Sequence, residues 1–431
     1  MGRLFLIALR NIQANKRRTV FLGGSILSVT VLLVILSAVL NGVRTTLITT
    51  GTTLMTGHVN IAGFFKPSTG QSAPTIVDFK PLLELAKQEV PDAVIVDRLR
   101  GWGKVVSDTG SMQLGMAGID VVNETRFKET ITVVSGSTDE LARPHTALIF
   151  EKQAARLGVK VGDRLTLSTT TLRGAYNSVD VEVVAIGKDL GMISGFQMYA
   201  SKDAIRDVYL LNENLTGAIL LYLPDPDQAE TVAERLRAAI AAKGYRTLEP
   251  LSQPFWMKFP IVNREDWTGQ KIDVTTWDDE MAFLLFSLKA IGGVRLIIGI
   301  VLLIVVIGGT LNAMWMAIRE RTREIGTLRA VGMGRGGVLL MFLIETVMLT
   351  AGSALAGAIV GNLIAVGLDY AQLPTGEFSL FLMRDTLRLL PDIEASAMLV
   401  GLITGVIGVF ALLPARKAAR LQPVQAMQHA G

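Results

Sequence analysis

Residues 317–337, AIRERTREIGTLRAVGMGRGG, hold five arginines and two glutamates and lie between two long apolar runs. Read as a helix, it places Glu320 three residues before Arg323 and Glu324 three residues after Arg321, so ion pairs can form along one face. Each exposed pair contributes only about 0.2–0.5 kcal/mol, which does not explain why so many charges gather here. A short helix with apolar residues among charges is suited to docking in a groove of another protein.

In this docking hypothesis Ile325 and Leu328 are the apolar anchors, with arginines around them. Gly326 allows close backbone approach, and Gly332 releases the chain from the helix. The alternative is a loop whose arginines only fix the orientation of neighbouring spans, which would need no Glu-Ile-Gly sequence. The residues expected to take part in docking are Arg319, Glu320, Arg321, Arg323, Glu324, Ile325, Gly326, Leu328, Arg329, Ala330 and Gly332.

Enzymatic chemistry has little support in the sequence. There is no cysteine, which excludes disulfides, thiolate metal sites and a cysteine nucleophile. The three histidines, His58, His145 and His429, have no metal-ligand spacing, and no serine stands in a nucleophile context. We therefore predict no catalytic, cofactor-binding or metal-binding residues in this chain, and no nucleic-acid partner.

Composition predicts a membrane protein that carries one sizeable aqueous domain. The 431 residues are 50% hydrophobic and 19% charged, with a mean hydropathy of +0.43. Four runs reach the roughly 20 residues that a helix needs to cross a bilayer. The predicted fold is a four-span α-helical transmembrane domain with a large α+β periplasmic domain between spans 1 and 2. The predicted spans are 19–43, a stalk and span over 281–318, 336–368 and 395–413.

Lysine and arginine in the short loops predict the orientation of the spans. The basic clusters lie in residues 1–18, in 319–335 and in 414–431, all on one side of a four-span protein. That side is predicted to be the cytoplasm, with both chain termini in it. Residues 44–280 and the loop 369–394 are then periplasmic. Residues 1–18 have the pattern of an amphipathic helix at the inner membrane surface.

Residues 44–280 mix short apolar strands with helical segments, which predicts an α+β domain of two lobes. Strands are expected at 58–62, 93–97, 103–107, 112–119, 163–169, 179–187 and 217–223, and helices at 79–90, 151–158 and 226–244. Aromatic residues gather just before the second span, and they either rest at the membrane surface or shape an apolar opening for a lipid-like cargo. They are Phe255, Trp256, Phe259, Trp267 and Trp277.

Two features of the spans bear on packing. The pairs Gly357/Gly361 and Gly401/Gly405 have the G-x-x-x-G spacing that permits close helix contacts, either between two copies or within one subunit. Glu345 in the third span would cost about 2.5–3.5 kcal/mol if it faced lipid. We expect it to reach the inner surface or to pair with an arginine such as Arg319, Arg335 or Arg17.

The stretch from Arg319 to Gly361 resembles the membrane subunits of ABC transporters of the type seen in the macrolide exporter MacB, the lipoprotein-releasing LolC and LolE subunits, and the division protein FtsX. The similarity lies in the E-I-G-x-L-R-A-x-G loop, the glutamate early in the next span, and the spaced glycines. The end PARKAARLQPVQAM (414–427) and LGVKVGDRLTL (157–167) are also similar to phrases of that family. The layout is closest to the LolC/LolE branch.

The resemblance implies that 319–335 is a coupling helix bound by a cytoplasmic ABC ATPase dimer, where ATP and Mg²⁺ would act. This chain has no G-x-x-x-x-G-K-[ST] loop, so we expect the ATPase to be a separate subunit. Implied further partners are a second permease copy or paralogue and a periplasmic carrier or adaptor. The chain would sit in the bacterial inner membrane and extract or export a hydrophobic or lipoprotein-like cargo. Alternatively, it would transmit force to a periplasmic cell-wall hydrolase without transport.

Overall fold

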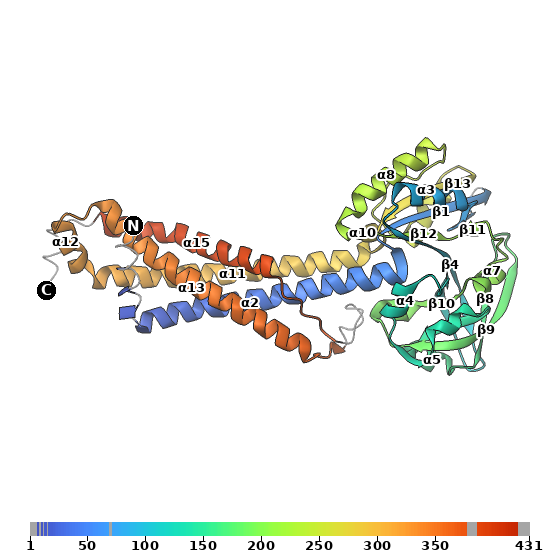
Figure 1. The fold of residues 1–431 in the computed structure, drawn as a ribbon, viewed down its shortest axis with the longest axis horizontal. Helices are drawn as coiled ribbons and strands as arrows, with labels where there is room; N and C mark the ends of the chain where they lie inside the picture. Colours follow the sequence, from blue (N-terminus) through green and yellow to red (C-terminus); the bar gives the residue numbers. More distant parts are fainter. Residues whose placement is uncertain are drawn as a thin grey trace. The chain divides into compact units, whose positions relative to one another are not determined.

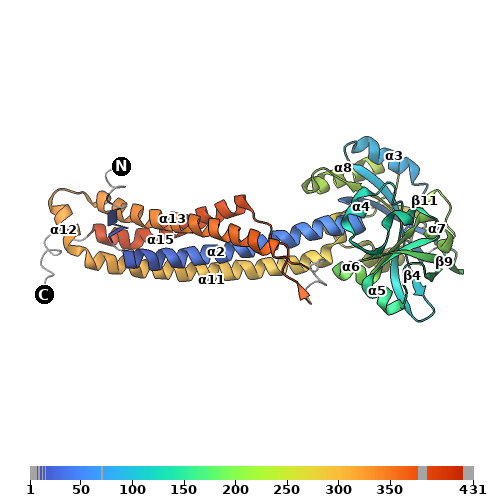
Figure 2. The same ribbon diagram turned by 60° about the horizontal axis from the view of Figure 1, so that its bottom comes forward.

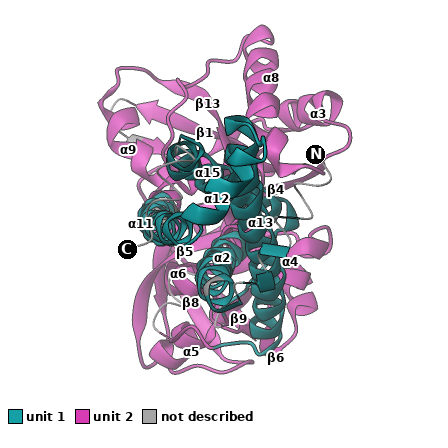
Figure 3. Ribbon diagram, turned by 90° about the vertical axis from the view of Figure 1, so that its left-hand side faces the viewer, with its two compact units in different colours: residues 1–43, 289–373, 387–431 teal, residues 44–288, 374–386 magenta. Residues whose placement is uncertain are grey.

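The computed structural model describes residues 7, 10, 11, 13, 14, 16–68, 71–376 and 386–420. These residues form two compact units, coloured separately in Figure 3. The helical unit comprises 1–43, 289–373 and 387–431, and the α+β unit comprises 44–288 and 374–386. Residues 7, 10, 11, 13 and 14 are helical, and 16–18 begin the first long helix. The other residues of the predicted amphipathic helix 1–18 lie outside the description, as do 377–385 and the end of the tail after residue 420.

Long helices run side by side through the helical unit (Figures 1 and 2). They are α2 (Lys16–Thr46), α11 (Ala282–Glu320), α13 (Arg335–Tyr370) and α15 (Ile393–Ala419), with the short α12 (Thr322–Ala330) between α11 and α13. Four stretches of the described chain are long and apolar enough to cross a bilayer: Thr19–Thr56, Gly292–Glu320, Arg335–Tyr370 and Ile393–Ala419. The number of spans therefore agrees with the sequence prediction.

Two of these helices are longer than a bilayer requires. A hydrocarbon core of about 30 Å takes about 20 residues, whereas α11 is unbroken over 39 residues. The first candidate span continues past α2 into a π-helix, η1 (Leu47–Thr56). Both helices therefore have residues to spare beyond a membrane, and both lead directly into the α+β unit.

Glycines bring α13 against α2 within one subunit. A Cβ atom at Gly357 would lie 2.7 Å from the Leu27 carbonyl oxygen, and one at Gly361 would lie 3.0 Å from Val34. Of the two explanations for this G-x-x-x-G pair, packing inside one chain is therefore the one observed. At Gly401 and Gly405 an added Cβ meets nothing within 4 Å, so this second pair leaves an open face on α15.

The last helix extends beyond its predicted end. The fourth span was predicted to end at residue 413, and Pro414, whose ring removes a helix hydrogen bond, follows directly. Instead, α15 continues through Pro414 to Ala419. Ala415 and Ala418 are fully buried in a cluster with Phe342 of α13, and this packing offsets the lost hydrogen bond.

The α+β unit contains one large sheet, a second sheet of two strands, and helices, which agrees with the predicted α+β class. Its strands are β1 (Val59–Ser68), β2 (Gln71–Ala73), β3 (Ile76–Val77), β4 (Val94–Val106), β5 (Ser111–Ile119), β6 (Val133–Gly136), β7 (Thr146–Phe150), β8 (Arg164–Thr170), β9 (Tyr176–Gly187), β10 (Gln197–Ser201), β11 (Leu215–Thr216), β12 (Ala218–Tyr222) and β13 (Gly269–Thr276). Its helical segments are α3 (Lys80–Glu89), α4 (Thr125–Thr130), η2 (Thr138–Ala142), α5 (Glu151–Leu157), α6 (Gly191–Phe196), α7 (Lys202–Tyr209), η3 (Pro226–Gln228), α8 (Ala229–Ala242), α9 (Phe255–Arg264) and α10 (Trp277–Glu280).

Strand β4 belongs to both lobes of this unit. Its first residues, Val94–Arg98, pair with β12 in the lobe built on β13, β1 and β12, which α8 covers. Its later residues pair with β5 and β8, and β5, β10, β7, β9 and β8 pair in turn until the ring closes on β4. The sequence predicted two separate strands at 93–97 and 103–107. That prediction was wrong, because the backbone stays extended through the intervening Arg98–Trp102.

Arg98 binds the end of the helix that arrives from the first span. Its Nη1 and Nη2 atoms donate hydrogen bonds to the carbonyls of Leu54 and Thr53, each at 2.7 Å. The last carbonyls of a helix have no partner within it, and they carry partial negative charge, so a cation there is favoured. Arg98 is 2% exposed and also forms an ion pair with buried Glu124. Tyr199 donates a further hydrogen bond to the Leu54 carbonyl at 3.1 Å.

Breaking the Arg98–Glu124 pair should cost far more stability than breaking an ion pair at the surface. We expect Glu124→Gln to lower the free energy of unfolding of the α+β unit by about 3–5 kcal/mol, because it leaves a buried guanidinium without its counter-charge. Glu84→Gln is the matched control, since it breaks the exposed Lys87–Glu84 pair and should cost at most about 1 kcal/mol. Melting of the purified full chain, followed by tryptophan fluorescence, measures both. Equal melting temperatures for the two variants would contradict the assigned role.

His58 should make stability depend on pH. Burial, with a smaller contribution from Arg126, lowers its pKa to about 4, and its ring nitrogen accepts a hydrogen bond from the Leu223 amide at 3.0 Å. The unfolded chain, with a histidine pKa of about 6.5, binds the proton first as pH falls. This contribution is therefore present above about pH 6.5 and is lost as pH falls towards about 4. His58→Asn keeps an acceptor that does not titrate, so its melting temperature should fall less than the wild type's between about pH 7 and about pH 5.

Candidate functional site

The short helix α12 presents a charged outer face. Arg323, Glu324, Thr327 and Ala330 are exposed, and they follow one another at the three- and four-residue spacing of a helix face. Val331, at the end of this face, is 83% exposed. Arg319, Glu320 and Gly332 are also exposed, and the backbone of Gly332 has a positive φ of 107°, which a glycine adopts without strain. This face is free to bind a partner.

The predicted apolar anchors point the other way. Ile325 is 1% exposed and packs with Ile318, Val338 and Ala415 of the neighbouring helices, and Gly326 is buried beside it. Leu328 is half-buried against the same cluster, and Arg329 is also half-buried. The prediction that Ile325 anchors a partner was therefore wrong. An isoleucine on a nine-residue helix stabilises that helix by packing against its own subunit, whereas the same side chain exposed to water would contribute nothing until a partner bound.

Glu345 connects α12 to the third span. It is 5% exposed, and its Oε2 atom lies 3.3 Å from Arg321 Nη1 and accepts a hydrogen bond from Asn11 at 3.3 Å. The expectation that Glu345 pairs with an arginine is confirmed, but the partner is Arg321 instead of Arg319, Arg335 or Arg17. Arg321 is therefore committed to its own subunit. Together with Ile325, it holds the outer face of α12 in a fixed orientation on the helical unit.

Basic residues gather around α12. The start of α2, α12 and the end of α15 lie at the same end of the helical unit (Figure 1). Arg416 and Lys417 of α15 and Arg420 just after it are exposed there, and Lys417 Nζ lies 4.7 Å from the centre of the Trp315 ring. This arrangement agrees with three basic clusters on one side of four spans.

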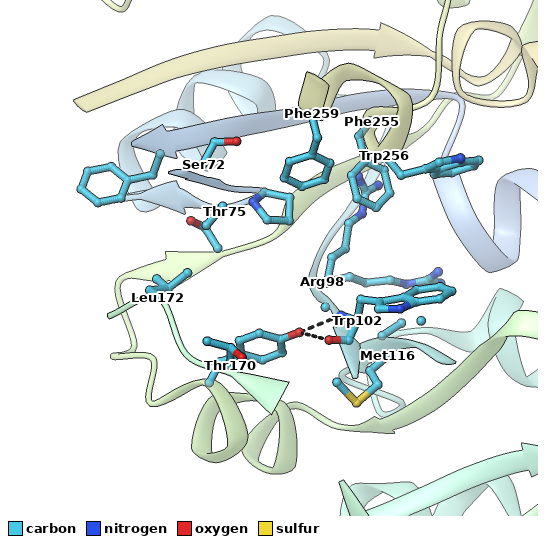
Figure 4. A pocket seen from close by; sticks show the side chains of 18 of the residues that line it. Ser72, Thr75, Arg98, Trp102, Met116, Thr170, Leu172, Phe255, Trp256 and Phe259 are labelled. Carbon is cyan, nitrogen blue, oxygen red and sulfur yellow. Dashed lines mark hydrogen bonds between the residues drawn. The ribbon is translucent and has the colours of Figure 1, made fainter. Parts of the chain in front are cut away.

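A second candidate site is an apolar cavity of about 900 Å³ within the α+β unit. Figure 4 shows Phe255, Trp256 and Phe259 of α9 on one side of it and Trp102 of β4 on another. Three of the five predicted cargo aromatics therefore line the cavity. Trp267 and Trp277 do not: Trp267 donates to Glu265 at 2.7 Å, and Trp277 is buried at the start of α10.

The cavity lies where β4 passes from one lobe to the other. Its wall includes Arg98, Arg100 and Trp102 of β4, Met116 of β5 and Leu172 from the turn between β8 and β9. Tyr209 closes one part of the wall, and its hydroxyl donates to the Trp102 carbonyl at 2.9 Å. Sequence reasoning missed Arg98 and Arg100, although two arginines among apolar strand residues were a visible signal.

Two family models match the chain. The MacB-like periplasmic core domain matches residues 21–239, about half of the chain, and the FtsX-like permease C-terminal domain matches residues 296–423. The first match covers the first span and most of the α+β unit, and the second covers the last three spans together with α12.

Curated relatives agree with these models. The chain is 37% identical to the pyoverdine export ATP-binding/permease protein PvdT of Pseudomonas fluorescens over 312 residues, which cover 71% of this chain and 42% of PvdT. It is 34% identical over 159 residues to the macrolide export ATP-binding/permease protein MacB of Chromobacterium violaceum, covering 37% of this chain and 23% of MacB. It is 31% identical over 149 residues to the uncharacterized ABC transporter permease YknZ of Bacillus subtilis, covering 34% of this chain and 32% of YknZ. The chain thus spans less than half the length of these relatives.

Solved structures of two periplasmic or extracellular domains are also similar. The periplasmic region of MacB from Actinobacillus actinomycetemcomitans matches with a TM-score of 0.32 and 12% identity, covering 53% of this chain and 94% of that one. The extracellular domain of YknZ matches with a TM-score of 0.30 and 15% identity, covering 43% of this chain and 95% of that one. On the strength of the two family models, the chain belongs to the MacB- and FtsX-type family of ABC transporter permeases, with a MacB-like periplasmic core domain between its first and second spans.

Proposed function

We propose that this permease couples ATP hydrolysis by a separate cytoplasmic ABC ATPase dimer to movement of its α+β unit, and that the movement exports or extracts a hydrophobic or lipoprotein-like cargo. The observation that carries the proposal is the exposed face of α12, fixed by Ile325 and by the Arg321–Glu345 pair. ATP and Mg²⁺ would bind in the partner and not in this chain.

The proposed orientation places α12 and both termini in the cytoplasm of a bacterium, with the α+β unit in the periplasm and the four spans in the inner membrane. The gathering of Arg319, Arg323, Arg335, Arg416 and Lys417 at one end of the helical unit supports it, since cytoplasmic loops are rich in lysine and arginine.

Force has a continuous route through the chain. A push on α12 reaches α13 through Arg321–Glu345 and reaches α15 through the cluster around Ile325. The helices α2 and α11 then continue into the α+β unit, where Arg98 holds the last carbonyls of η1. A rigid helix whose end is hydrogen-bonded into a sheet transmits displacement better than a flexible linker does.

Four helices are too few to enclose a cargo within the membrane, so we further propose that two copies, or this chain and a paralogue, associate side by side in the bilayer. The open face at Gly401 and Gly405 is available for close contact with another helix. A periplasmic carrier or adaptor would receive the cargo. The cavity of about 900 Å³ favours cargo handling over a purely regulatory stroke on a cell-wall hydrolase, because transmission of force alone needs no cavity.

The outer face of α12 can be tested with two single substitutions. We expect Val331→Asp to weaken binding of the ATPase about tenfold or more, since it places a charge where an exposed apolar side chain would be buried in the partner's groove. ATP hydrolysis should then no longer drive transport in vesicles. Binding is measured by co-purification and titration of the ATPase on the permease in nanodiscs.

Ile325→Val is the matched control on the inner face of the same helix. It removes one methylene from the core, at a cost of about 0.5–1.5 kcal/mol of stability, and should leave ATPase binding unchanged. Normal binding in Val331→Asp, or loss of binding in Ile325→Val with the fold intact, would show that α12 does not dock in this orientation.

A further inference from the structure

The cavity in the α+β unit differs from an ordinary apolar pocket in its charge. We propose that it binds an amphipathic anion, a single molecule with one carboxylate or phosphate group and an apolar body, and that Arg100 holds the anionic group. This inference rests on the proposed function and deepens it, because it names the chemical class of the cargo.

All the charged side chains that line the cavity, among the described residues, are positive. Arg98 and Arg100 are the charged residues among the described residues that line it, and no aspartate, glutamate, lysine or histidine does. Arg98 is already satisfied, because its guanidinium binds Glu124, the carbonyls of Thr53 and Leu54, and the Tyr222 hydroxyl. Arg100 is therefore the group that has binding capacity left.

Arg100 is poorly satisfied for a guanidinium, which has five N–H donors. In the described structure its side chain makes one long hydrogen bond, from Nη2 to the Met55 carbonyl at 3.4 Å, and its buried Nη1 atom has no partner. Its Cζ atom lies 4.9 Å from the centre of the Phe255 ring. Leaving donors of a charged group unsatisfied away from water is costly, and a bound anion would remove that cost.

The acidic group that acts most strongly on Arg100, Glu280, does not take this role. Burial lowers the pKa of Arg100, and the charge of Glu280 opposes that shift from a distance. The carboxylate of Glu280 is occupied elsewhere, because it accepts hydrogen bonds from Asn60, from Thr275 and from the backbone N–H of Phe255. Arg100 thus feels the charge of Glu280 but has no ion-pair partner among the described residues, which is the state expected of a site that receives an anion.

The rest of the wall fits an apolar body. Trp102, Trp256, Phe259, Met116 and Leu172 surround the space in Figure 4. Its volume of about 900 Å³ lies within the range of pockets that enclose one small molecule. The hydroxyl of Thr75, also in the wall, is buried without a hydrogen-bond partner and offers a second polar contact. A neutral acceptor could take a hydrogen bond from Arg100, but only an anion would also balance its charge.

The probe for this site is dibromostearate, whose bromine atoms quench tryptophan fluorescence on contact, compared with its uncharged methyl ester. The protein is the full chain in nanodiscs, without any ATPase, in a Trp315→Phe background that removes the tryptophan of the helical unit. We expect the acid to bind about tenfold or more tightly than the ester, since a hydrogen bond between charged groups is worth that factor or more. Dibromostearate from solution and brominated anionic phospholipid in the disc then distinguish a free amphipath from a bilayer lipid as the source.

Arg100→Met should abolish the preference for the acid while ester binding and melting temperature stay the same, and Arg100→Lys should restore part of the preference. The double variant Trp102→Phe/Trp256→Phe should lose most of the quenching. Equal affinity for acid and ester in the parent protein, an unchanged preference in Arg100→Met, or quenching that persists without both cavity tryptophans would overturn the proposal. Because no ATPase is present, a negative result here leaves docking on α12 untouched, and failure of docking leaves this site untouched.

Discussion

Arg98 joins the helix that arrives from the membrane to the sheet that follows it. The end of η1 has carbonyl oxygens that no later residue of the helix can bind, and Arg98 of β4 supplies donors to two of them. Because the guanidinium is buried, Glu124 must neutralise it, and Tyr199 and Tyr222 complete the network. The same strand carries Arg100 and Trp102 into the cavity. A displacement of η1 would therefore first move β4, the strand that forms part of the cavity wall.

A second ion pair, Arg321–Glu345, connects two helices inside the helical unit. Glu345 in a membrane span is tolerable because Arg321 pairs with it, and this pair holds α12 to α13 while Ile325 holds it to α15. Both connections use an ion pair with little exposure: each side chain is 3% exposed in Arg98–Glu124, and the two are 13% and 7% exposed in Arg321–Glu345. Buried pairs contribute little net stability compared with apolar packing, but breaking one is costly, so they favour a single arrangement of the elements they join.

The sequence was most informative where one physical signal dominates. Long uncharged runs predicted the number of spans, and periodicity predicted α3, α5 and α8 with every helix end within three residues of its predicted position. It was misleading where a charge is buried. Arg98 and Arg100 interrupt the apolar alternation of 93–107, so one strand was predicted as two. Ile325 looked like an anchor for a partner because the sequence shows which residues are apolar but not which neighbour buries them.

The same reasoning explains why only part of the cavity wall could be predicted from the sequence. Its aromatic side, Phe255 to Phe259, is contiguous in the chain and could be recognised as a cluster. Its charged side comes from β4, and other parts of the wall come from η1, β2, β5, α6 and the turn after β8, segments that only the fold brings together. A cluster of aromatics alone fits either a membrane surface or an apolar ligand. An arginine with unused donors in the same cavity favours the ligand, because burying an unpaired guanidinium among apolar side chains costs free energy that a bound anion would offset.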